Sequence, residues 1–135
     1  MALHRKHRLL VAADQSYLWR VRHQHNEGCE EVLTLRRIGS PSARILRFRS
    51  RPGFSVPDGG VSAAGVVGDD RDRWLNLNEP GVVRAFVDAL SAADWPAGDR
   101  LTRDLDGWAW FAEAHDRHAR RGEHAQSPAS SPDPK

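Results

Sequence analysis

Three side chains that could do chemistry lie close together in the first quarter of the chain: His23, His25 and Cys29. Residues two apart on a strand point to the same face, so His23 and His25 could present two imidazoles to one metal ion. A zinc site would need a further ligand, and Cys29, His115 or His118 could supply it. Cys29 could instead act as a nucleophile with His25 as its base. Two solvated histidines beside a half-buried cysteine explain the same spacing. We adopt this simpler interpretation and expect no cofactor.

A second group of candidate residues is basic. Residues 1–51 contain 11 Lys or Arg and 4 Asp or Glu, a net charge of +7, whereas residues 52–135 contain 9 and 14, a net charge of −5. If the predicted strands pair with their apolar faces in register, five arginines share the opposite face: Arg20, Arg22, Arg36, Arg47 and Arg49. Such a face could contact phosphates or an acidic protein surface. The alternative is internal pairing of these arginines with Glu30, Glu31 or acids of the second half.

The elements that would position these residues follow from hydrophobic periodicity. Tyr17, Trp19 and Val21 alternate with polar neighbours, as in a half-buried strand. Similar patterns predict strands at 8–12, 16–23, 30–37, 43–50, 61–67 and 74–77. Pro80 in a first turn predicts a helix over 79–94, and Gly122 as a cap predicts a second helix over 106–121. The fold class is therefore α+β, with an antiparallel sheet of four to five strands packed by one helix and a second, C-terminal helix.

The length of 135 residues and a composition with 39% hydrophobic residues fit one globular domain over 8–121. We expect residues 1–7 to be flexible and residues 122–135 to form a disordered tail, because the tail holds few apolar groups. The predicted core consists of Trp19, Leu33, Leu35, Leu46, Phe48, Leu77, Val83, Phe86, Val87 and Leu90. The longest apolar run near the amino terminus, Leu9 to Ala13, is too short for a secretory signal or a membrane span, so we expect a cytoplasmic protein.

The strand with Tyr17-x-Trp19, the stretch from Asn76 to Leu90 and the following Trp95-Pro96 resemble a loose group of small uncharacterised bacterial proteins. In that group a Tyr-x-Trp strand opens an antiparallel sheet, and a helix entered through proline packs against it before a Trp-x-Pro or similar turn. The resemblance covers roughly residues 8–96. It implies the fold and transfers no activity. Members of the group finish with a short strand, whereas this chain is expected to continue into a helix.

These patterns lead us to expect a non-enzymatic, cytoplasmic protein-interaction module, accessory or immunity-like, that uses the basic sheet face. Nucleic-acid binding by the same arginines is an alternative. It is disfavoured because Tyr17 and Trp19 point inward and offer no platform for stacked bases. A metal-dependent or cysteine enzyme around His23, His25 and Cys29 is the third possibility. We expect a protein partner in preference to nucleic acid, no membrane, and no nucleotide, because no phosphate-binding glycine motif occurs.

Overall fold

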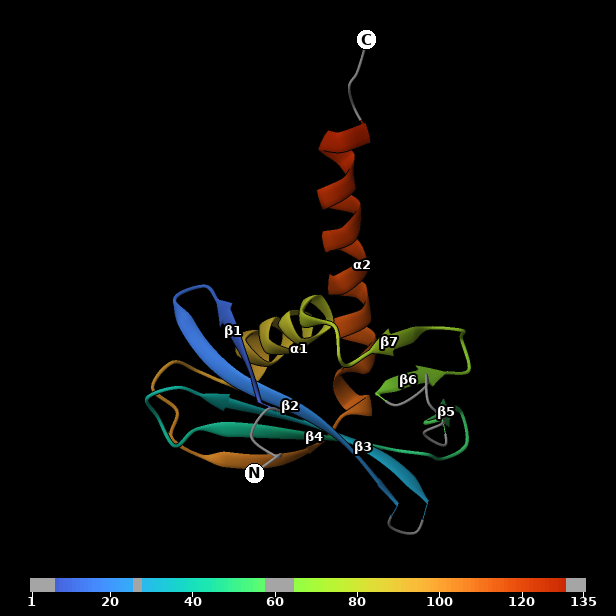
Figure 1. The fold of residues 1–135 in the computed structure, drawn as a ribbon, viewed down its shortest axis with the longest axis horizontal. Coiled ribbons are helices and arrows are strands. Elements are labelled where there is room, and N and C mark those ends of the chain that lie inside the picture. The colour runs from blue at the N-terminus through green and yellow to red at the C-terminus, as the bar shows by residue number, and fades with distance from the viewer. Residues whose placement is uncertain (1–6, 26–27, 58–64, 131–135) are drawn as a thin grey trace.

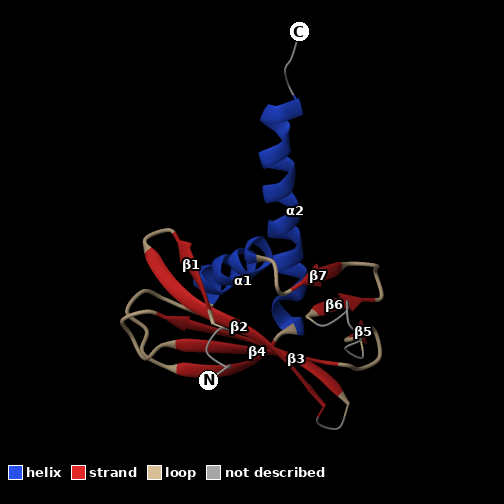
Figure 2. Ribbon diagram, viewed as in Figure 1, coloured by secondary structure: helices blue, strands red, loops and turns tan. Residues whose placement is uncertain are grey.

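The computed structural model of the chain describes residues 7–25, 28–57 and 65–130, with side chains described as far as residue 122. Its largest element is a five-stranded sheet with the strand order β1-β2-β3-β4-β8 (Figures 1 and 2). The strands are β1 (Arg8–Ala12), β2 (Gln15–His25), β3 (Cys29–Arg37), β4 (Ala43–Arg49) and β8 (Thr102–Asp106). β1 to β4 pair antiparallel, and β8 joins β4 in parallel.

The remaining elements are two helices and a second, smaller sheet. They are α1 (Pro80–Ala93), α2 (Trp108–Ser130), β5 (Phe54–Ser55), β6 (Val66–Asp69) and β7 (Trp74–Asn76). In Figure 2 the helices and the small sheet lie on the same side of the large sheet. The predicted α+β class and a sheet packed by a helix are confirmed, and the sheet is antiparallel except where β8 joins β4. Within the described residues, no helix has the length and apolar character that a membrane span requires.

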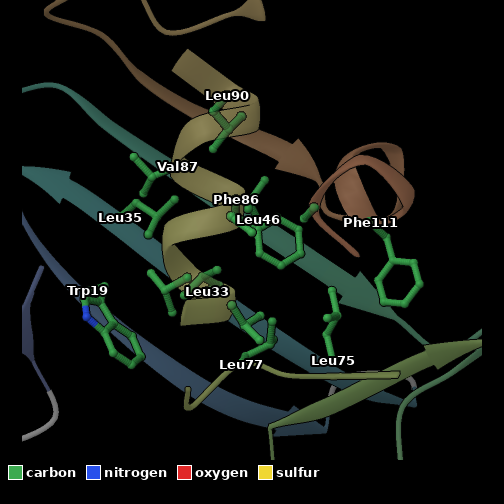
Figure 3. Packing of buried hydrophobic residues seen from close by; sticks show 14 of the residues in the cluster. Trp19, Leu33, Leu35, Leu46, Leu75, Leu77, Phe86, Val87, Leu90 and Phe111 are labelled. Carbon is green, nitrogen blue, oxygen red and sulfur yellow. The ribbon is translucent and has the colours of Figure 1, made fainter. Parts of the chain in front are cut away.

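The register of the large sheet divides its side chains between two faces. Trp19 pairs with Leu35, and Leu33 pairs with Leu46, so the apolar positions of β2, β3 and β4 meet on one face. We call this the inner face, and Figure 3 shows these side chains beneath α1. All ten residues of the predicted core are buried. The opposite, outer face carries the intervening residues, including Leu18, Arg20, Arg22, Thr34, Arg36, Ile45, Arg47 and Arg49.

α1 covers the inner face along one apolar stripe. The helix begins at Pro80, whose missing N–H is one of the donors that a first helical turn leaves unpaired in any case. Its buried side chains are Val82, Val83, Ala85, Phe86, Val87, Ala89 and Leu90. The helix ends at Ala93, before the Trp95-Pro96 turn, as predicted from the restriction that proline places on the residue before it.

Two of the predicted strands form, but the prediction that they belong to the large sheet is wrong. The segments predicted at 61–67 and 74–77 do not extend the large sheet, because β6 pairs with β5 on one side and with β7 on the other in a sheet of their own. Residues 61–64 lie outside the described residues. The fifth strand of the large sheet is β8, in a segment where the sequence predicted the approach to the second helix. A short strand therefore does follow the Trp95-Pro96 turn, and the chain then continues into the second helix, as expected.

The second helix is longer than predicted. α2 continues past Arg121 to Ser130, so Gly122 lies within the helix and does not cap it. In Figure 1 the carboxyl-terminal half of α2 projects away from both sheets. Residues 131–135 of the predicted tail lie outside the described residues, as do residues 1–6 of the predicted flexible amino terminus.

Replacing Phe86 by alanine tests the packing of α1 on the sheet. Phe86 is fully buried and meets Phe48 edge to face, with 5.6 Å between ring centroids. We expect Phe86→Ala to lower the free energy of unfolding by about 3–5 kcal/mol in urea titrations, because the cavity is fully enclosed. Ser91→Ala on the exposed side of the same helix should stay within about 0.5 kcal/mol of the wild type. A loss below about 1 kcal/mol for Phe86→Ala would contradict the packing.

Deleting residues 123–135 tests how much the end of α2 contributes. A helical segment without tertiary packing is marginally stable in water, and this one projects from the body of the molecule (Figure 1). We expect the truncated chain to melt within about 2 °C of the full chain by circular dichroism. A drop of more than about 5 °C would show that the segment docks on the domain.

Candidate functional site

Two buried arginines hold the turn that follows α1. The Arg37 guanidinium donates hydrogen bonds to the carbonyls of Trp95 and Pro96, at 2.8 and 2.7 Å, and lies 4.4 Å from the centre of the Trp95 ring. Arg44, only 1% exposed, lies 5.0 Å from the same ring and donates to the carbonyls of Asp94 and Leu101. We call this arrangement of Arg37, Arg44 and Trp95 the arginine clasp.

A short polar network completes the clasp. The Trp95 indole N–H donates to Ser42 Oγ at 2.7 Å, and Ser42 in turn donates to Asp99 at 2.5 Å. Arg44 forms an ion pair of 3.1 Å with the same Asp99 oxygen. The hydrogen bond from Ser42, assisted by Arg44 and by the Leu101 N–H, lowers the pKa of Asp99 to about 2. The network fixes the segment that leads into β8.

β8 supplies carboxylates to the arginines of β4. Arg47 Nε donates to Asp104 at 2.8 Å, and this hydrogen bond raises the pKa of Arg47. Asp106 lies 3.4 Å from Arg51. Glu30, buried on β3, pairs with Arg49 at 3.0 Å and with Arg47 at 3.6 Å. Two of the five arginines predicted to form a binding face therefore have internal carboxylate partners.

The other three predicted arginines have no such partner. Arg20, Arg22 and Arg36 lie on the outer face of β2 and β3, and no carboxylate of the described chain pairs with any of them. Arg22 and Arg36 are exposed. The Nε of Arg20 is buried and has no hydrogen-bond partner in the part of the chain that the structure describes. We call these three residues the arginine triad.

Apolar side chains adjoin the arginine triad. Leu9 pairs with Leu18 and Val11 with Ser16, so β1 continues the outer face beside β2. Leu9 and Val11 are 63% and 56% exposed, and Ile38, just after β3, is 44% exposed. We call Leu9, Val11 and Ile38 the apolar corner. The outer face thus combines three cationic groups with exposed aliphatic surface, and no described element covers it (Figure 1).

The predicted metal ligands lie on the inner face, at the end of the β2–β3 hairpin where the chain connects the two strands. His25 and Cys29 are direct partners in the hairpin register, with 3.6 Å between Nδ1 and Sγ. His23 stands next along the same face, its ring centre 4.7 Å from that of His25. The structure therefore brings His23, His25 and Cys29 together. His115 and His118 on α2 belong to no ligand cluster of the described residues.

Sequence reasoning missed two groups of this site. Arg37 and Arg44 were not singled out. Each lies two residues from a core leucine, Leu35 or Leu46, and this spacing on a strand already assigns both arginines to the inner face. Glu31, fully buried and bonded to His23 Nδ1 at 2.6 Å, was considered only as a partner for arginines. Alternation with Leu33 and Leu35 assigns Glu31 to the inner face in the same way, and the hairpin register then pairs it with His23.

Comparison with protein families, curated proteins and solved structures gives no match.

Replacing Asp99 by asparagine tests the polar network through acid unfolding. Because the folded-state pKa, about 2, lies below the ordinary value of 3.8, the ionised group stabilises the fold above pH 3.8 and loses that contribution as the pH falls toward 2. We expect Asp99→Asn to be less stable than the wild type at neutral pH, and the difference to shrink between these two pH values. Urea titrations at a series of pH values measure it. A difference that stays constant over that interval would contradict the network.

Proposed function

We propose that this chain is a non-enzymatic, cytoplasmic protein-interaction module of the accessory or immunity-like kind, and that its contact surface is the outer face of the large sheet. The observation that supports this most strongly is the unpaired arginine triad beside the apolar corner. Arginine is enriched and lysine depleted at protein–protein contacts, and the buried centre of such a contact is more apolar than the rest of the surface. We infer an acidic protein partner that also presents apolar side chains.

The position of the aromatic rings and the low net charge favour a protein partner over nucleic acid. A single-strand binder would offer aromatic rings for base stacking on its basic face. Tyr17 and Trp19 are buried on the inner face, and the exposed Trp74 belongs to the small sheet. The net charge of the whole chain is only +2, which gives weak long-range attraction to a phosphate backbone.

Site-specific photo-crosslinking in the native cell tests this proposal. A photoreactive residue replaces Thr34, which lies on the outer face between Arg20 and Ile45 in the register. The matched control carries the same residue at the exposed Ala119 on α2. We expect a discrete, protease-sensitive adduct from position 34 and none from position 119.

Charge variants test whether the crosslink depends on the arginine triad. Arg22→Gln with Arg36→Gln should abolish the adduct while changing stability by no more than about 0.5 kcal/mol per site. Arg117→Gln with Arg120→Gln removes the same charge from α2, where both side chains pair with acids four residues earlier, and should leave the adduct intact. A nuclease-sensitive adduct would favour the nucleic-acid alternative. Equal adducts from positions 34 and 119, or no effect of the Arg22 and Arg36 changes, would overturn the proposal.

A further inference from the structure

We propose that His23, His25 and Cys29 together bind one divalent transition-metal ion, with zinc the preferred metal. One ligand atom from each of the three side chains lies within 4.8 Å of the other two. No other group of three histidine, cysteine or acidic side chains in the described chain meets the same condition. The site is on the inner face, so it is independent of the proposed contact surface.

The hairpin register creates the geometry. His25 and Cys29 are opposed at the last pair of the β2–β3 ladder, and His23 is two residues earlier on the same face. Zinc bonds of about 2.3 Å to sulfur and about 2.0–2.1 Å to nitrogen, at a tetrahedral angle, place the two ligand atoms about 3.6 Å apart. The distance between Cys29 Sγ and His25 Nδ1 is 3.6 Å. This pair can therefore coordinate an ion without moving relative to each other.

Glu31 orients the third ligand, His23. Its carboxylate contacts His23 Nδ1 at 2.6 Å and is held in place by the N–H of Gly65 at 2.9 Å. This contact keeps the proton on Nδ1 and leaves the lone pair on Nε2, as in the carboxylate–histidine pairs that support zinc ligands. His23 Nε2 is buried and has no hydrogen-bond partner among the residues described. A bond to a metal ion would satisfy this atom.

The charges at the site favour a cation. Glu31 has no solvent exposure, and its only ion-pair partner in the described chain is His23. A buried carboxylate is costly unless positive charge compensates it. A divalent ion on the other side of the His23 ring would provide that charge. Two imidazoles and a thiolate select zinc, cobalt or copper over magnesium or calcium, and three protein ligands leave a fourth position for water beside the exposed His25.

Cobalt titration tests the site with a direct readout. The full chain is purified, stripped of metal with a chelator and titrated with Co²⁺. We expect saturation at one ion per chain, the intense visible bands of tetrahedral cobalt, a thiolate-to-cobalt charge-transfer band, and loss of both on adding Zn²⁺. Cys29→Ser should remove the charge-transfer band, and Glu31→Gln should weaken binding by about 10–100-fold. His115→Ala with His118→Ala is the control and should bind as the wild type does.

Two results would overturn the proposal. One is the absence of saturable binding, or the weak spectrum of six-coordinate cobalt. The other is an unchanged spectrum in Cys29→Ser. Circular dichroism of each variant separates lost binding from lost folding. Cys29 is only partly buried, so we expect Cys29→Ser to fold. This variant therefore still tests the site if Glu31→Gln does not fold.

Discussion

The arginine clasp is the interaction on which the rest of this structure depends. Two guanidinium groups lie against the Trp95 ring and also bond the carbonyls around it, so the chain leaving α1 has a fixed position against the sheet. Two buried cations would be costly if unpaired. Here Asp99 pairs with Arg44, and backbone carbonyls accept hydrogen bonds from the terminal nitrogens of both arginines, while the Nε of each has no partner among the described residues. The clasp therefore both anchors the end of α1 and aims the following segment along the edge of β4.

The position of β8 determines which arginines remain available to a partner. β8 adds Asp104 and Asp106 beside β4, and those acids pair with Arg47 and Arg51. β2 and β3 have no such neighbour on the outer face except Glu30, which pairs with Arg47 and Arg49. The unpaired positive charge is thereby concentrated on the half of the face that adjoins β1, next to the apolar corner.

The long strands and α1 could be predicted from the sequence because each has a clear physical period. Alternation at Tyr17, Trp19 and Val21 identified β2, and the helical spacing from Val82 to Leu90 identified α1. β8 could not be predicted, because four of its five residues are polar or charged and four are exposed, as an edge strand permits. The predicted second helix instead began at residue 106, the last residue of this strand.

The candidate sites were predictable to different degrees. Period-two alternation placed the five arginines on one face, but pairing with β8 is a long-range contact that no local pattern reveals. The spacing of His23 and His25 predicted a shared face. Their closeness to Cys29 depended on the hairpin register, and the role of Glu31 depended on its complete burial.

The division between paired and unpaired arginines is the central claim, and the exchange of guanidinium Nε protons with water measures it directly. In ¹⁵N NMR spectra of the free protein, Arg47 and Arg49, whose Nε atoms donate to Asp104 and Glu30, should show slowly exchanging Hε signals. Arg22 and Arg36 should exchange rapidly. Protection of Arg22 and Arg36 equal to that of Arg47 would mean that their charges are already neutralised within the fold, and would contradict the account.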